Sequence, residues 1–342
     1  MQIGCVLGFK LAISRGRLIT MGALFLNGFM LPLGYSKNGP VDPAGAVRVT
    51  LQLKWTHQFQ FAGYYAALEK GYYRDLGLEV VLVEATKSGD PMTELMKGNA
   101  QFGIGSSELV VHRANGQRVV ALAAIFQHSP LVLVANADRG IHRVPDLLGK
   151  TVLFEPQSEE ILAYLQAEGI YLENLDIDRG AHDILRLKNG EVDAMTAYLT
   201  DELFLLEGED YPVFRPTSAG IDFYGDTLFT TEEQVGKHPG IVDAFLRASV
   251  QGWAYALDHE DEIIDLILTK YRRSKSRDHL KFEAQRTRGL VLPGTNGEIG
   301  TMSPGRWRQI AATYHRLGRI KQKDFPLNGF IYAIGPSRPV PR

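Results

Sequence analysis

The chain is poor in cysteine. Its 342 residues include one, Cys5, which lies in the N-terminal segment. A single thiol cannot form an intrachain disulfide, and it cannot build a site that needs several thiolates. Beyond residue 46 we therefore expect no disulfide, no cysteine nucleophile and no thiolate metal site, although the absence of disulfides does not exclude export.

An excess of charge is also absent. The chain has 37 Lys and Arg residues against 39 Asp and Glu residues, so its formal net charge is -2. Such a balance gives no electrostatic reason to expect binding to nucleic acid or to an anionic membrane surface. The composition, 45% hydrophobic and 22% charged, is typical of a globular protein, and the length fits two domains or one large bilobed unit.

Long apolar runs are missing except near the N-terminus. Residues 18–33 are almost wholly apolar, with Asn27 as the one strongly polar interruption, and Lys10, Arg15 and Arg17 precede them. This order predicts the charged and apolar regions of a signal peptide. An uncleaved anchor and an ordinary buried helix are the alternatives for the same run.

A candidate cleavage site follows the apolar run, but at some distance from it, which keeps the uncleaved anchor open as an alternative. Residues 34–46 are polar and rich in turn formers, and Ala44-Gly45-Ala46 fits the small-x-small pattern. We therefore expect residues 1–46 to be a signal peptide, or an N-terminal anchor with its linker, and Val47 to begin the mature chain.

Recognisable catalytic and metal motifs are scarce. The sequence has no HExxH, no GxSxG and no Gly-Lys-Ser/Thr, and His57, His112, His128 and His142 are scattered. His57 and His128 each follow a predicted strand, but two histidines without a fixed acid are weak evidence for a metal. We predict no catalytic residues and no metal site.

The first half of the chain alternates strands and helices. Apolar and β-branched patterns predict strands at 47–53, 78–84, 100–105, 119–127 and 131–135, with helices at 63–70, 91–97 and 109–114. This rhythm favours a mostly parallel sheet with helices on both faces.

The pattern restarts near Asp138 as a smaller α/β lobe. Strands are predicted at 151–154, 192–197 and 211–215, with helices at 158–168 and 185–190. A strand at 229–231 returns to the first lobe, and helices follow at 239–258, 261–271, 278–290 and 304–317. We assign residues 47–137 and 227–335 to lobe 1, 138–226 to lobe 2 and 336–342 to a tail. Two lobes joined by two crossings are typical of hinge-closing solute-binding proteins.

A polar-aromatic loop follows the first predicted strand. It holds Trp55, His57, Phe59 and Phe61, and Tyr64 lies in the helix after it. Ligands of open α/β sheets sit at the carboxyl ends of strands. Flat side chains there predict a flat ligand, and the alternative is that these aromatic rings are simply core.

A turn of small residues lies between another strand and helix. Ser106 and Ser107 offer hydroxyls and free N–H donors, and Glu108 can accept hydrogen bonds from an amino group. The alternative is a helix cap with a glutamate in the first turn. The third glycine of a dinucleotide fingerprint is absent, so nucleotide binding is unsupported.

The predicted return crossing, residues 220–226, combines carboxylates, aromatics and glycines. It can present Asp222 or Tyr224 to the cleft, or it is a turn whose aromatics fill the interface between the lobes. In lobe 2, Tyr198 and Glu202 follow one strand and Glu155 and Glu159 follow another. Each of these pairs is otherwise an ordinary solvated surface feature.

Six segments carry a family resemblance: residues 53–67, 103–108, 123–133, 193–198, 220–226 and 304–307. Through them, from about residue 47 to about residue 332, the chain resembles the NMT1/THI5-like (SsuA/THI5-like) family of periplasmic binding folds. The resemblance implies an α/β, bilobed periplasmic-binding-protein (type II) fold, with two doubly wound sheets joined by a two-crossing hinge. It also implies a small planar ligand, often a thiamine-pyrimidine precursor.

The resemblance favours an exported solute-binding protein that serves an inner-membrane ABC permease and needs no cofactor. The family also contains thiamine-pyrimidine synthases, which would need pyridoxal phosphate and iron. Those enzymes use a lysine after the strand that ends here at Ile104, where residues 105–109 have none, and a cysteine-rich motif. A sensor module is the third alternative, favoured if the N-terminal segment is uncleaved.

Taken together, the sequence predicts a set of ligand-binding residues. Its members are Trp55, His57, Phe61, Tyr64, Ser106, Ser107, Glu108, Phe126, His128, Glu159, Tyr198, Asp222, Tyr224 and Asp226. In this hypothesis the ligand stacks on Trp55 and on Phe126 or Tyr224, while Glu108 and Asp222 accept its amino hydrogens.

Overall fold

The computed structural model describes residues 45–85, 90–155, 158–272, 275–293, 298–323 and 325–333. The predicted signal peptide or anchor, apart from its last two residues, lies outside these ranges, and so does the predicted tail. Within the described ranges, no helix is both long enough and apolar enough to span a membrane.

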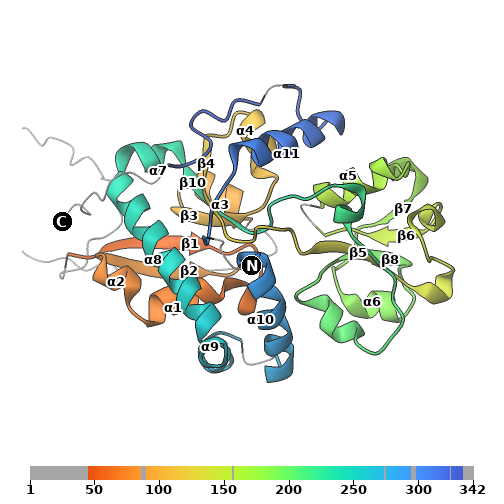
Figure 1. The fold of residues 1–342 in the computed structure, drawn as a ribbon, viewed down its shortest axis with the longest axis horizontal. Coiled ribbons are helices and arrows are strands. Elements are labelled where there is room, and N and C mark those ends of the chain that lie inside the picture. The colour runs from red at the N-terminus through yellow and green to blue at the C-terminus, as the bar shows by residue number, and fades with distance from the viewer. Residues whose placement is uncertain are drawn as a thin grey trace, which may run out of the picture. The chain divides into compact units, whose positions relative to one another are not determined.

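The first sheet has five strands in the order β2-β1-β3-β10-β4 (Figure 1). They are β1 (Val47–Gln52), β2 (Leu78–Val83), β3 (Phe102–Gly105), β4 (Val119–Ala124) and β10 (Thr227–Thr231). Strand β1 is parallel to β2 and β3, whereas β10 is antiparallel to β3 and β4. The sheet is therefore mixed, because its fourth strand enters from the other lobe.

Helices cover both faces of this sheet, as the alternating sequence pattern predicts. They are α1 (Ala62–Glu69), α2 (Tyr72–Asp75), α3 (Pro91–Lys97), α4 (Leu109–Ala114), α7 (Glu232–Lys237), α8 (Pro239–Asp258), α9 (Glu260–Leu266), α10 (Arg277–Val291) and α11 (Pro304–Arg316). A single π-helical turn, Ile267–Tyr271, extends α9.

The second sheet has the strand order β7-β6-β8-β5-β9. Its strands are β5 (Leu131–Ala135), β6 (Thr151–Leu153), β7 (Asp176–Asp178), β8 (Ala194–Tyr198) and β9 (Val213–Phe214), and its helices are α5 (Glu159–Ala167) and α6 (Ile184–Lys188). Strand β5 pairs antiparallel with β8 and β9. It therefore belongs to the second sheet, although the sequence pattern groups residues 131–135 with lobe 1.

Two chain segments cross between the sheets and hydrogen-bond to each other. The Phe126 N–H donates to the Asp226 carbonyl at 3.0 Å, the Gly225 N–H donates to the Phe126 carbonyl at 3.0 Å, and the Ser129 N–H donates to the Phe223 carbonyl at 3.0 Å. A Cβ on Gly225 would lie 2.9 Å from the Phe126 Cβ, so this close approach requires glycine.

The core forms separate apolar clusters. One lies between the first sheet and helices α1, α8, α9 and α10, and a second continues from the opposite side of that sheet through Tyr224 and α11 to α5. A third fills the other side of the second sheet.

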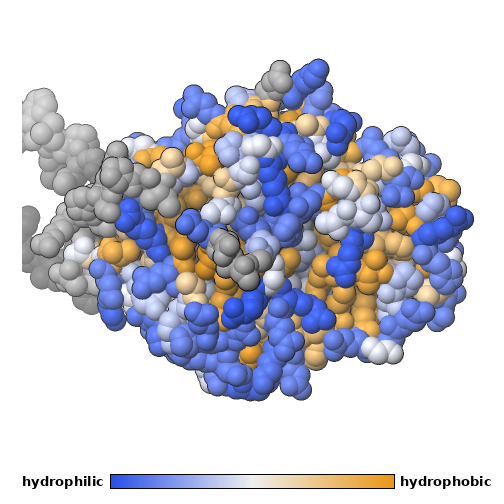
Figure 2. Space-filling model, in the orientation of Figure 1, coloured by the Kyte–Doolittle hydropathy of each residue, from blue (hydrophilic) through white to orange (hydrophobic). Residues whose placement is uncertain are grey.

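The face shown in Figure 2 is mostly hydrophilic, with apolar side chains interspersed. Most of the exposed large apolar residues lie in the second lobe: Leu148, Tyr171, Leu172, Leu185 and Leu205.

Candidate functional site

A buried lysine lies where the two lobes meet. Lys54 follows β1, and its side chain is 10% exposed. Its Nζ donates to the Tyr198 hydroxyl at 2.7 Å and lies 3.3 Å from Asp226 Oδ1. Tyr198 ends β8 of the second sheet and Asp226 ends the return crossing. Residues from both lobes and the hinge therefore surround one ammonium group.

The surroundings keep this ammonium group charged. Burial alone lowers the pKa of Lys54, but Tyr198, Asp226 and Glu108 outweigh that effect and hold the Lys54 pKa well above its usual value. Burial raises the pKa of Asp226, while Lys54 and the Gln60 amide oppose the rise. Gln60 Nε2 donates to Asp226 Oδ2 at 2.8 Å.

Further carboxyl groups lie close to this lysine. Burial raises the pKa of Glu155 to about 7, and Lys54 only partly offsets this rise. Burial, with Asp201 and Glu155 nearby, raises the pKa of Glu202 to about 8. Glu202 Oε2 accepts the Tyr198 N–H at 2.8 Å. Near neutral pH these carboxyls can donate or accept a hydrogen bond, so the site is suited to a ligand with both functions.

Trp55 meets the second lobe, as the hypothesis of a shared cleft requires. It is partly buried, and its ring lies edge-on to His182 with the ring centroids 6.4 Å apart. His182 Nε2 donates to the Thr196 carbonyl at 2.8 Å. Burial lowers the pKa of His182, so its imidazole is neutral at pH 7.

Three predicted aromatic residues lie in the interior of the first lobe instead. Phe61 and Phe126 are 0% exposed and Tyr64 is 1% exposed. Tyr64 and Phe126 both lie edge-on to Trp253, at 5.9 and 6.1 Å between ring centroids. Their rings serve as core, which is the alternative interpretation, because all three belong to the apolar cluster between the first sheet and its helices.

His57 lies on the α1 side of the loop. Its Nδ1 is 2.9 Å from the Tyr65 hydroxyl, and its ring centroid is 5.0 Å from that of Tyr271. Burial lowers the pKa of His57; Glu84 raises it and Arg272 lowers it further.

In the turn after β3, the two serines have different partners: Ser106 bonds to Glu108, and Ser107 contacts Tyr314. The Ser106 N–H donates to Glu108 Oε1 at 2.9 Å, and the Ser106 hydroxyl donates to the same carboxylate. The Ser107 hydroxyl lies 2.8 Å from the Tyr314 hydroxyl of α11. Glu108 is close enough to raise the pKa of both Lys54 and Asp226, whereas Ser107 faces the neighbouring helix.

The other hinge residues form a separate polar group with α11. Asp222 Oδ1 lies 2.7 Å from His128 Nδ1 and 2.7 Å from Arg306 Nη2. The Tyr224 hydroxyl accepts the Ser303 N–H at 2.8 Å, and the Arg306 guanidinium lies 4.3 Å from the Tyr224 ring centroid. Asp222 and Tyr224 therefore brace α11 against the hinge and do not meet the Lys54 group.

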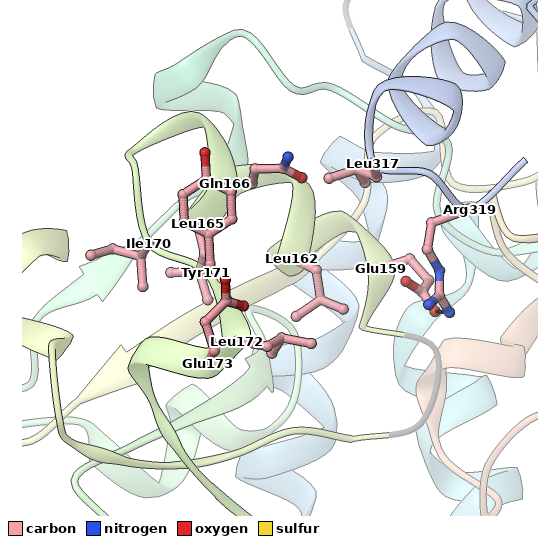
Figure 3. Close-up of a pocket in the computed structure, with 10 residues that line it drawn as sticks. All are labelled: Glu159, Leu162, Leu165, Gln166, Ile170, Tyr171, Leu172, Glu173, Leu317 and Arg319. Atoms are coloured by element: carbon pink, nitrogen blue, oxygen red, sulfur yellow. Dashed lines mark hydrogen bonds and ion pairs between the residues drawn. The ribbon is translucent and has the colours of Figure 1, made fainter.

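Glu159 does not belong to the Lys54 group and instead lines a pocket of about 230 Å³ (Figure 3). Its carboxylate pairs with Arg319, and the two side chains point toward one another at one end of that pocket. Burial raises the pKa of Glu159, and Arg319 opposes the rise. Leu162 and Leu172 lie along the same wall.

A second ionic cluster also bridges the lobes. Lys275 Nζ donates to Asp201 Oδ1 at 2.7 Å, to Gln58 Oε1 at 2.8 Å and to Glu283. His279 Nε2 lies 2.7 Å from Asp201 Oδ1. Asp201, His279 and Glu283 have the donor atoms of a metal site within 4.8 Å of one another, but the Lys275 ammonium already supplies the positive charge there.

Sequence reasoning missed Lys54, Gln60 and His182 as site residues. A signal was available for Lys54, because it is a cation at the end of an apolar strand and directly precedes Trp55. For His182 no local signal exists, since it follows an irregular loop after β7.

Comparison with known proteins gives the family. The sequence model of the NMT1/THI5 like family matches residues 58–263. A formylaminopyrimidine-binding protein of Halalkalibacterium halodurans is 23% identical over 80% of this chain and 86% of its own length. The riboflavin-binding protein RibY of Chloroflexus aurantiacus is 26% identical over 74% of this chain and 77% of its own length.

Solved structures share the fold. A protein of Bordetella bronchiseptica RB50 aligns with a TM-score of 0.67 at 15% identity, over 83% of this chain and 94% of its own. The alkanesulfonate-binding protein SsuA of Xanthomonas axonopodis pv. citri aligns with a TM-score of 0.64 at 12% identity, over 83% and 98%. The expected bilobed type II binding fold is thus confirmed, and the chain belongs to the NMT1/THI5-like family.

Proposed function

We propose that this chain is an extracytoplasmic solute-binding protein of an ABC-type uptake system. It would capture a small planar ligand, such as an aminopyrimidine precursor of thiamine, between its lobes. The observation that carries the proposal is the Lys54 group, in which Tyr198 from one sheet and Asp226 from the hinge meet a buried lysine. A binding site built from both lobes couples ligand capture to lobe closure.

The chemistry of this group matches an aminopyrimidine. Three carboxyl groups lie near one ammonium group, that of Lys54. Asp226 and Glu108 raise the pKa of Lys54, and Lys54 in turn opposes the rise in the pKa of Glu155. Carboxylates accept hydrogen bonds from an exocyclic amino group, and a lysine donates to a ring nitrogen. The partly buried Trp55 offers a ring face, worth about 1 kcal/mol in an aromatic pair beyond area burial.

Export and a permease partner follow from the same proposal. The structural neighbours include proteins named as periplasmic sulfonate-binding proteins, and residues 1–46 have the order of a signal peptide. A binding protein outside the cytoplasmic membrane needs a membrane partner to move its ligand inward.

The synthase alternative does not fit the residues present. One relative, 23% identical over 64% of this chain and 72% of its own length, is named 4-amino-5-hydroxymethyl-2-methylpyrimidine phosphate synthase, from Legionella pneumophila. The sequence after β3 has no lysine at residues 105–109, and Cys5 is the one cysteine of the chain. The lysine and the cysteine-rich motif expected for pyridoxal phosphate and iron are therefore missing from this sequence.

Titration calorimetry and tryptophan fluorescence with a panel of aminopyrimidines and riboflavin test the proposal. We expect an aminopyrimidine to bind at one site, and Trp55→Ala to weaken binding about tenfold or more, equivalent to about 1.4 kcal/mol. Tyr171→Ala, which removes a ring that is 47% exposed on lobe 2, is the control and should leave affinity unchanged. Failure of every panel compound to bind, or unchanged affinity in Trp55→Ala, would contradict the proposal.

A further inference from the structure

A pocket of about 560 Å³ adjoins the Lys54 group, and residues of both lobes line it. Its volume falls within the usual range for small-molecule sites, roughly 300–1,000 Å³. The charged and polar groups that matter for its chemistry are His182, Asp183, Asp201, Glu202, Arg272 and Lys275. We call this hollow the Arg272 pocket.

Most of the charges in its wall already have partners. The three N–H donors of Lys275 point to Gln58, Asp201 and Glu283, so this ammonium is saturated. Asp201 Oδ1 accepts a hydrogen bond from Lys275 and also lies 2.7 Å from His279 Nε2. These groups compensate one another and leave little for a ligand.

The remaining acidic and histidine side chains are also accounted for. Asp183 Oδ1 accepts the Leu185 N–H at 2.9 Å, as the cap of α6. Glu202 accepts the Tyr198 N–H, and burial raises the pKa of this glutamate to about 8, so it is largely protonated at pH 7. His182 donates to the Thr196 carbonyl and is neutral.

Arg272 is different. Its guanidinium has no ion pair with any residue in the described ranges, and its Nε is buried without a hydrogen-bond partner there. A guanidinium keeps its charge and presents its donors in a fixed planar fork that matches a carboxylate or phosphate. A buried donor without a hydrogen-bond partner is costly, so this position favours an incoming acceptor such as a carboxylate or phosphate oxygen.

The backbone holds Arg272 in place. It follows the π-helical turn Ile267–Tyr271, and its N–H donates to the Ile267 carbonyl at 2.7 Å. Tyr271 stacks on Tyr65 with the ring centroids 4.3 Å apart. The guanidinium is therefore carried by an anchored turn, and its charge is felt as far as His57, whose pKa it helps to lower after burial.

The pocket shares walls with the Lys54 group. His182 lines the pocket and faces Trp55. Glu202 also lines it and holds the backbone of Tyr198, whose hydroxyl accepts from Lys54. A ligand whose planar ring lies at Trp55 and Lys54 can therefore extend a substituent into the Arg272 pocket.

We propose that the Arg272 pocket is a subsite for an oxyanion group, a carboxylate or a phosphate, attached to the planar ligand. The inference rests on the proposed function and narrows its ligand class to heterocycles that carry such a group. Arg272 is the specificity residue of the subsite, because it is a cation of the wall that has no ion pair within the described residues.

Calorimetry on the full chain tests the inference with three probes: a hydroxymethyl aminopyrimidine, its phosphate monoester, and inorganic phosphate alone. We expect the ester to bind about tenfold or more tightly than the alcohol. Arg272→Gln should abolish this preference and leave the affinity for the alcohol unchanged, and Arg272→Lys should keep part of it. Arg277→Gln is the matched control, since that arginine is 41% exposed and pairs with Asp261.

The outcomes separate the two proposals. If neither the alcohol nor the ester binds, the proposed function fails and the inference fails with it. If the alcohol binds but the ester gains nothing, or if Arg272→Gln keeps the preference while its melting temperature matches the parent, the inference alone is overturned. Inorganic phosphate binding as tightly as the ester would also overturn it, because the site would then hold a free anion and not a ligand substituent.

Discussion

At the scale of single residues, Lys54 is the charged group around which the junction of the two lobes is organised. Burial alone would favour its neutral form, but the neighbouring Tyr198, Asp226 and Glu108 keep it charged. Asp226 depends on this cation in turn, since its carboxylate is buried and its other partner is the neutral Gln60 amide. The Lys54 ammonium and the Asp226 carboxylate therefore stabilise each other in the charged form.

Replacing Lys54 by methionine should destabilise the protein by about 3–5 kcal/mol, because the buried Asp226 carboxylate loses its counter-ion. Urea unfolding at pH 8 measures the effect. Lys97→Met is the control: that lysine is 57% exposed and pairs with Glu94, so its loss should cost below about 1 kcal/mol. A cost for Lys54→Met no larger than the control would mean that this charge pair contributes nothing to stability.

Glu155 gives a prediction about pH. Burial raises its pKa from 4.5 to about 7, so between these values the folded state binds a proton that the unfolded state has lost. The stability contributed by this group is present below about pH 4.5 and is lost as the pH rises through about 7. Glu155→Gln does not titrate. It should match the parent at pH 5 and exceed it at pH 8.5, by on the order of 1–3 kcal/mol.

Melting temperatures of Glu155→Gln and the parent, compared from pH 5 to pH 8.5, measure this difference. Glu79→Gln is the control, because its side chain is 47% exposed and should give a pH-independent difference. A gap between parent and Glu155→Gln that stays constant over the range would show that burial does not raise the pKa of Glu155.

The residue-scale hypothesis drew its residues from loops at the ends of strands, and the structure orients their side chains in different directions. Trp55, Tyr198 and Asp226 do lie around the junction between the lobes. Phe61 and Phe126, from equally suitable loops, turn into the core. Which way a ring points depends on the helix packed above it, and a local pattern does not contain that information.

At the scale of elements, the crossing of α1 and α8 depends on two glycines. A Cβ on Gly252 would lie 2.1 Å from the Gly63 carbonyl oxygen, and one on Gly63 would lie 2.1 Å from Trp253 Cγ. The first contact is with backbone, which cannot rotate away. The sequence shows these glycines inside helical patterns, where they lower helix propensity, and only the packing explains them.

Gly252→Ala should therefore destabilise the protein by about 3 kcal/mol or more, since α8 must move away from α1. Gly289→Ala in α10 is the matched control, because a Cβ there meets nothing within 4 Å. It should be neutral or stabilising by up to about 1 kcal/mol. Chemical denaturation of both variants measures the difference, and equal effects would contradict the close crossing.

Long periodic elements were predictable and short ones were not. Helix α8, Pro239–Asp258, has the predicted bounds because its amphipathic pattern is long and begins at a proline. Strand β7, Asp176–Asp178, was missed because it has three residues, two of them acidic. Its extended form comes from pairing with β6. The strand at 131–135 was predicted, but its sheet was not.

At the scale of the whole molecule, the Lys275 cluster is one of the contacts that link the two lobes. Asp201 comes from lobe 2, whereas Glu283 and His279 come from α10 of lobe 1. Burial raises the pKa of Glu283 to about 7, and Lys275 partly offsets the rise. Without the ammonium, two carboxyl groups from opposite lobes would face each other with only His279 between them.

Lys275→Met should therefore favour separation of the lobes at pH 8, because breaking a buried pair costs about 3–5 kcal/mol and leaves like charges opposed. Small-angle scattering should give a larger radius of gyration than for the parent. Lys281→Met, in which a lysine that is 47% exposed loses its pair with Asp261, should leave the radius unchanged. An unchanged radius in Lys275→Met would mean that other contacts hold the lobes.

The sequence by itself determined the α/β class, the two lobes, the long helices and the loops at the carboxyl ends of strands. These features follow from periodicity and turn chemistry, which act over a few neighbouring residues. Only the tertiary structure decided which charges meet. Lys54 and Tyr198 are 144 residues apart in the chain, and Lys275 and Gln58 are 217 apart. Such pairs depend on how the lobes close, because electrostatic and packing energies are set by distance in space and not by position along the chain.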